Sequence, residues 1–121
     1  MALAQAHMAV GALSLARAAI GRAQDIAERA GELAHLAQVF RLRGNIEAAD
    51  STGDARAALA CYQRALEFGR PRGLRPLMAN TLSDMARACE AAGDGAAAQR
   101  HRDQARLLFA ELGLPALSPP A

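Results

Sequence analysis

Residues 53–73 read GDARAALACYQRALEFGRPRG, and the same arrangement of residue types occurs twice more in the chain. Residues 11–31 read GALSLARAAIGRAQDIAERAG, and residues 93–113 read GDGAAAQRHRDQARLLFAELG. In each stretch a glycine is followed by an alanine, a larger residue, a second alanine and a second glycine at the same intervals. The template residues between the glycines are Ala16, Ile20 and Ala23, then Ala58, Tyr62 and Ala65, then Ala98, Arg102 and Ala105. A template that recurs at a nearly fixed period predicts a repeat architecture.

Each copy of the template predicts a helix with its end signals. Asp54 and Asp94 are natural N-caps, because their carboxylates can accept from free N–H groups of the first turn. Gly31, Gly73 and Gly113 stand where a helix ends in the left-handed conformation. The intervals between copies also carry apolar residues at helical spacing. The sequence therefore predicts helices over 2–9, 12–30, 32–51, 54–69, 76–92 and 94–112.

The predicted helix over 32–51 has apolar residues on two flanks, with a polar strip of Gln38, Arg41 and Asn45 between them. A helix at the edge of a small bundle buries a single stripe. Two buried flanks require neighbours on both sides, which favours a stack of helix hairpins.

Composition excludes several classes of protein. The 121 residues make one domain, and 14 basic against 12 acidic residues, a net charge of +2, do not indicate a nucleic-acid partner or a membrane surface. No apolar run approaches the roughly 20 residues of a membrane span. The N-terminal apolar stretch lacks the basic residues of a signal peptide. Cys61 and Cys89 are isolated, so we expect a reducing, cytoplasmic location.

The pattern of Gly, Ala, aromatic and Ala with a helix before it resembles the tetratricopeptide repeat. FRLRGNIEAADSTGDARAALACYQRAL (40–66) and LRPLMANTLSDMARACEAAGD (74–94) are similar to the C-terminal repeat arrays of bacterial signalling ATPases, among them LuxR-type regulators and adenylate-cyclase-linked ATPases. The resemblance implies an all-α, right-handed solenoid of about 2.5 to 3 antiparallel hairpins. Its units would be a truncated hairpin over 1–31, hairpins over 32–73 and 74–113, and a flexible Pro-rich tail over 114–121. The copies start 42 and 40 residues apart, against about 34 in the common repeat, so longer helices are expected.

No catalytic constellation is present in the sequence. His7, His35 and His101 fall on three predicted helices, with no acid at the spacing of a triad or a metal site. The chain has no lysine and no Gly-rich phosphate loop. We therefore expect neither enzymatic activity nor a cofactor or metal site.

The resemblance implies a concave groove lined by the first helix of each hairpin. The polar residues expected to hold a peptide or partner there are Gln38, Arg41, Asn45, Asn80, Ser83, Arg87 and Glu90. Arg41 and Asn45 resemble the basic and amide pair that clamps a C-terminal carboxylate, although Asp84 would repel such a group. The alternative is that this strip is an ordinary solvated face.

The two ends of the array differ. Arg102 replaces the aromatic in the last copy, as a polar end cap would. At the N-terminus, Leu3, Ala4 and His7 would be core positions of a truncated helix with no cap. That end predicts either a piece of a longer array or a face that pairs two copies. We thus expect an interaction module that serves as the sensor or scaffold part of a signalling protein, with homo-oligomerisation, such as a homodimer, as the alternative.

Overall fold

The computed structural model describes residues 2–50 and 55–113, with side chains from residue 11 onward. Within these ranges the chain is all α-helical and contains no strand, which confirms the predicted class. The α-helices are α1 (Ala2–Ala30), α2 (Leu33–Ala49), α3 (Ala55–Gly69), α4 (Arg75–Ala91) and α5 (Gly95–Glu111), and a 3₁₀ helix follows α3 at Arg70–Arg72. The predicted tail over 114–121 lies outside the described residues.

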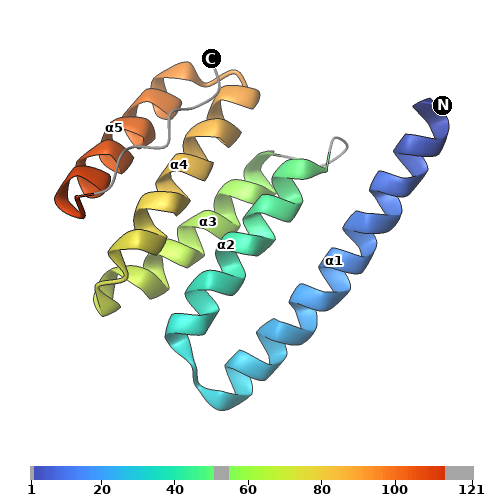
Figure 1. Ribbon diagram of the computed structural model, residues 1–121, viewed down its shortest axis with the longest axis horizontal. Coiled ribbons are helices and arrows are strands. Elements are labelled where there is room, and N and C mark those ends of the chain that lie inside the picture. The colour runs from blue at the N-terminus through green and yellow to red at the C-terminus, as the bar shows by residue number, and fades with distance from the viewer. Residues whose placement is uncertain (1, 51–54, 114–121) are drawn as a thin grey trace.

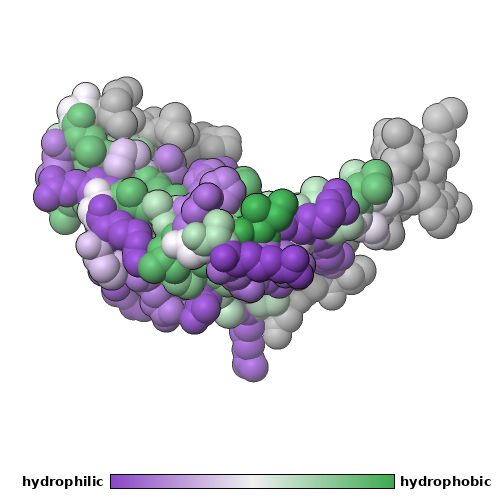
Figure 2. All heavy atoms as spheres, turned by 90° about the horizontal axis from the view of Figure 1, so that it is seen from below, coloured by the Kyte–Doolittle hydropathy of each residue, from purple (hydrophilic) through white to green (hydrophobic). Residues whose placement is uncertain are grey.

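The helices follow one another in a row. Each packs against the next in chain order, α1 and α5 lie at opposite ends, and α2 also contacts α4 (Figure 1). The molecule is arched, and the arch opens on the side where α2 and α4 lie in front of α3 (Figure 2). We call α2 and α4 the inner layer. This sequential layering agrees with a stack of hairpins, although it is not specific to one repeat family.

The template alanines of the second and third copies are buried between the helices. Ala58, Ala65, Ala98 and Ala105 are each at most 3% exposed. The main core joins α3, α4 and α5; its larger members include Tyr62, Leu66, Leu82, Met85 and Phe109. Small side chains at the crossings let the backbones approach and leave the larger groups to fill the space between them.

The predicted helix ends are mostly confirmed. Gly31, Gly73 and Gly113 have φ of 68°, 64° and 70°, in the left-handed region that glycine adopts without strain. Asp94 caps α5 and accepts a hydrogen bond from the Ala97 N–H at 3.1 Å. The other predicted cap, Asp54, lies outside the described residues.

The prediction of a truncated first hairpin was wrong. Instead of helices over 2–9 and 12–30 with a turn at Gly11, a single helix of 29 residues covers Ala2–Ala30. Gly11 lacks a positive φ. A lone glycine inside a helix costs only about 1 kcal/mol relative to alanine, and the surrounding alanines favour the helix strongly enough to continue through it.

The first copy of the template also packs differently from the other two. Ile20 was expected to be covered by the following hairpin, yet it is only half-buried. Among residues 11–30 of α1 only Ala27 is buried, while Leu15 and Ile26 are 75% and 67% exposed. Because α1 stands at the end of the row, α2 covers only part of its apolar side.

Gly44 lies directly against the ring of Tyr62 where α2 crosses α3. A Cβ added at Gly44 would lie 2.9 Å from Cζ of Tyr62 and closer still to Cδ1 and Cε1. Gly44 is the small residue of this helix, whereas counting back from Gly53 by the repeat spacing would place Ile46 at its small position. The structure assigns that position to Gly44, since no larger residue fits beneath the ring.

Candidate functional site

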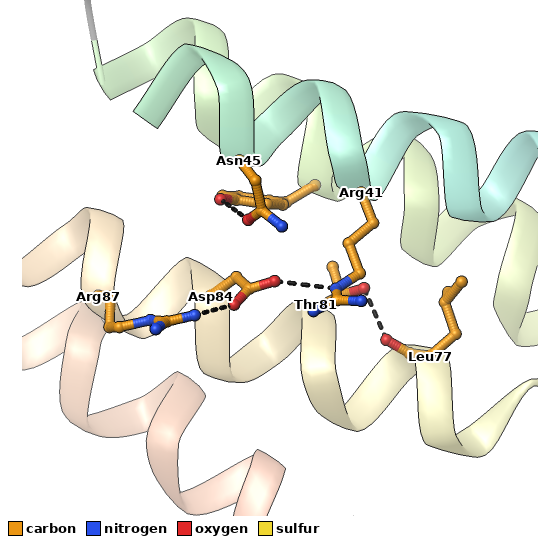
Figure 3. A network of polar contacts seen from close by, with 7 residues as sticks. Arg41, Asn45, Leu77, Thr81, Asp84 and Arg87 are labelled. Atoms are coloured by element: carbon orange, nitrogen blue, oxygen red, sulfur yellow. Dashed lines mark hydrogen bonds and ion pairs between the residues drawn. The ribbon is translucent and has the colours of Figure 1, made fainter. Parts of the chain in front are cut away.

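The inner layer carries a network of charged side chains that links α2 to α4. Nε of Arg41, on α2, donates to Oδ2 of Asp84, on α4, at 2.9 Å. Nη2 of Arg87 donates to the other carboxylate oxygen of Asp84 (Figure 3). Asp84 and Arg87 are three residues apart and so share one face of α4. We call Arg41, Asp84 and Arg87 the Asp84 network.

The carboxylate of Asp84 is almost fully removed from water. Its side chain is 2% exposed, whereas those of Arg41 and Arg87 are 22% and 61% exposed. A buried carboxylate is costly unless it is paired and hydrogen-bonded, and the two guanidinium groups satisfy both of its oxygens. Arg41 therefore connects the two helices, while Arg87 extends from the network into solvent.

Asn45 adjoins the network (Figure 3). The hydroxyl of Tyr62 donates to Oδ1 of Asn45 at 2.6 Å. This leaves the amide nitrogen of Asn45 with no hydrogen-bond partner among the described residues. Nearby, Thr81 satisfies its own buried hydroxyl by donating to the carbonyl of Leu77 at 2.6 Å. Asn45 thus keeps two free N–H donors at the surface of the inner layer.

A hollow of about 350 Å³ opens beside these groups. Its lining consists of Asn45, Ala48, Ala49, Tyr62, Asp84, Arg87, Ala88 and Ala91. The lining combines polar side chains that can donate or accept hydrogen bonds with alanines, whose small side chains leave the hollow open. Such a surface can take a peptide backbone, whose carbonyl groups need donors and whose bulk needs shallow walls.

The structure brings together only some of the predicted groove residues. Asn45 and Arg87 line the hollow, and Arg41 is joined to it only through its hydrogen bond to Asp84. Glu90 is exposed and accepts from Nη2 of Arg102, on α5, at 2.5 Å, so it belongs to the α4–α5 pair. Gln38, Asn80 and Ser83 are half-buried on the same two helices and take no part in the network.

Two residues of the site were not predicted in these roles. Tyr62 was assigned to packing alone, and Asp84 only to repulsion of a ligand carboxylate. Asp84 instead accepts a hydrogen bond from Arg41, the basic residue of the predicted carboxylate clamp. Tyr62 donates to the side-chain oxygen of Asn45, the amide residue of that clamp. The spacing of Asp84 and Arg87 in the sequence, an i,i+3 pair of opposite charge, was the available signal for the first of these contacts.

The remaining predicted sites can be placed only in part. The side chains of Leu3, Ala4 and His7 lie outside the described part of the chain. In the described ranges no three His, Cys, Asp or Glu side chains are grouped to hold a metal ion. None of the helices there combines the length and apolar character that crossing a membrane requires.

Burial raises the pKa of Tyr62 well above its usual value, and the neighbouring Asp84 carboxylate raises it further. Tyr62 is the sole tyrosine and the chain has no tryptophan, so tyrosinate absorbance reports on it alone. In the unfolded chain in denaturant, Tyr62 should titrate at about pH 10. In the folded protein we expect no tyrosinate at that pH. Because the folded pKa is the higher one, the contribution of Tyr62 to stability is complete below about pH 10 and is lost as pH rises further. Titration of the folded chain at the ordinary value would contradict this environment.

Comparison of the chain with protein families, with curated proteins and with solved structures finds no match.

Proposed function

We propose that this chain is a non-enzymatic interaction module of the tetratricopeptide kind, which binds a peptide or a partner domain on its inner layer. In this proposal it acts in the cytoplasm as the sensor or scaffold part of a signalling protein. The proposal rests on residue patterns and contacts within this chain.

Three features support the tetratricopeptide assignment. The chain alternates inner helices with outer ones in a row. The template alanines of the second and third copies are buried at helix crossings. Finally, a glycine of one helix lies beneath the aromatic ring of the next, at Gly44 and Tyr62. The buried alanines and Tyr62 belong to the repeated template, and Gly44 lies on the helix that precedes its second copy.

One observation carries the binding role: unsatisfied donors from two separate helices face the same hollow. Asn45 on α2 offers its amide N–H groups there, and Arg87 on α4 offers the guanidinium N–H groups that Asp84 does not use. Asp84 and Tyr62 hold these two side chains in place before any ligand arrives. Preorganised donors bind with a smaller loss of entropy on association than mobile ones do.

The proposal is tested by selecting ligands for the purified chain from a displayed library of random 12-residue peptides. We expect the selected peptides to bind Arg87→Ala at least about fivefold more weakly than the unchanged protein, as loss of a charge-assisted hydrogen bond predicts. Arg106→Ala is the matched control, because Arg106 is 57% exposed and pairs with an aspartate three residues before it, as Arg87 does, but lies on α5.

Two results would count against this function. One is a library that yields no peptide whose affinity depends on Arg87. The other is a set of peptides that lose as much affinity on Arg106→Ala as on Arg87→Ala. That result would mean that the peptides bind the outer surface or respond only to the net charge of the protein.

A further inference from the structure

A second hollow, which shares only Asn45 and Ala49 with that at the Asp84 network, lies between α1 and α2 and is almost wholly apolar. It measures about 550 Å³ and is lined by Leu13, Ala16, Ala19, Ile20, Ala23, Leu42, Asn45, Ile46 and Ala49. Beside it Leu15 and Ile26 are 75% and 67% exposed, and Leu42 is 39% exposed. We call this the α1–α2 groove. An exposed apolar surface of this kind is unfavourable in water and marks a site of association.

The N-terminal part of α1 extends past α2. The two helices have 29 and 17 residues. Arg17 donates to Glu47 and Asp50, at 3.2 and 2.6 Å, and so fixes the last turn of α2 beside residue 17. About twelve residues of α1 therefore lie beyond the end of α2. An isolated helix of that length is only marginally stable in water.

The exposed apolar side of α1 has the spacing of a coiled coil. Positions 8, 12, 15, 19, 22 and 26 alternate steps of four and three residues and hold Met, Ala, Leu, Ala, Arg and Ile. A repeat of 3.5 residues keeps one seam facing a partner helix along its whole length. This seam lies beside the α2-facing side of α1 and runs through both the part next to α2 and the part beyond it.

We propose that the occupant of the α1–α2 groove is the α1 helix of a second copy of this chain, antiparallel to the first, with Leu15 of each copy packed against Ala19 of the other. This goes beyond peptide binding at the inner layer and does not depend on it. It also replaces Leu3, Ala4 and His7, which fall outside this seam, as the residues that pair two copies.

The register follows from size and from overlap. With Leu15 opposite Ala19, Arg22 lies over Ala12, so that in both of these pairs a large residue meets a small one. The centre of the pairing is residue 17, close to the middle of α1, so nearly the whole helix is covered. Residues 4–12 of each copy then lie beside residues 22–30 of the other, next to its α2 and groove.

The expected contact area matches a dimer of moderate strength. The paired length of α1, about 43 Å, and the adjoining wall of α2, each about 10 Å wide, give roughly 700 Å² per copy. Stable complexes bury about 800 Å² per partner. The area is therefore sufficient for self-association, and we expect the dimer to exchange with the monomer at micromolar concentrations.

Sedimentation equilibrium of the purified chain tests the proposal over about 1 to 500 µM, the range expected for an interface of this size. The average mass should rise from that of one chain towards twice that value. Leu15→Glu should hold it at the monomer mass over the whole range. Leu107→Glu, at a leucine that is 66% exposed on α5, should leave the rise unchanged. A monomer at every concentration would overturn the proposal and leave a foreign helix as the occupant, and a dimer unaffected by Leu15→Glu would place the contact elsewhere.

The direction of pairing is tested separately by disulfide formation. In a chain with Cys61→Ser and Cys89→Ala, one preparation carries Leu15→Cys and another carries Ala19→Cys. On oxidation the mixture should form the Leu15→Cys/Ala19→Cys heterodimer several-fold faster than either preparation forms a homodimer, because a disulfide needs Cα atoms within about 7 Å. Faster linkage of Leu15→Cys to itself would indicate parallel helices and contradict the assigned register.

Discussion

Asp84→Ala should lower the free energy of unfolding by about 2 to 4 kcal/mol, somewhat less than the loss from breaking a fully buried ion pair. The substitution removes the carboxylate that both arginines share. Arg41, only 22% exposed, is then left between α2 and α4 without a counter-charge. A cavity at a side chain that is 2% exposed adds to the cost. Urea denaturation followed by circular dichroism measures the change.

Arg87→Ala is the control for this substitution. Its side chain contacts the same carboxylate but is 61% exposed, so water can take its place beside Asp84, and we expect a smaller loss of about 1 kcal/mol. Asp84→Asn keeps the shape and one acceptor and should fall between the two. An Asp84→Ala protein as stable as the unchanged chain would show that the Asp84 network does not hold the two helices together.

Gly44→Ala should lower the free energy of unfolding by about 1 to 3 kcal/mol, the usual cost of overpacking a core. In an open helix the same change would stabilise, because alanine is the better helix former. Here the added methyl group meets the ring of Tyr62, which is 1% exposed and held by its hydrogen bond to Asn45. The ring cannot move away without loss of that bond and of its own packing.

Gly21→Ala supplies the matched control with the opposite sign. Gly21 also lies inside a helix, but no atom comes within 4 Å of its missing Cβ. We expect it to raise the free energy of unfolding by about 0.5 to 1 kcal/mol. If Gly44→Ala stabilised the protein as Gly21→Ala does, Gly44 would not lie against the ring of Tyr62 as described.

The helices could be predicted because their signals are local. Alanines at crossings, an aspartate cap and glycines with positive φ each act within a few residues of one another, and the predicted bounds of α2 to α5 fall within two residues of those observed. The predicted break at Gly11 was wrong because the local signals there favour a continuous helix. The template assigned it the role of a terminator, whereas its own neighbours favour helix and nothing packs there to end it.

The candidate site was less accessible from sequence because it depends on contacts over a long separation. Arg41 and Asp84 are 43 residues apart, and their meeting depends on how closely α2 approaches α4. The polar strip identified Arg41, Asn45 and Arg87 as neighbours on helix faces. It could not show that the buried carboxylate of Asp84 would pair with Arg41. Nor could it show that the hydroxyl of Tyr62 would orient Asn45.

The ion pair between Arg41 and Asp84 also bears on the mechanics of the arch. It is a direct link between two alternate helices, α2 and α4, on the open side of the curve. Guanidinium groups remain protonated at all physiological pH values, so acidity in that range leaves the arginine side of the link unchanged. An anion that competes for Arg41 would instead relax it, and the distance between the outer edges of α1 and α5 would widen.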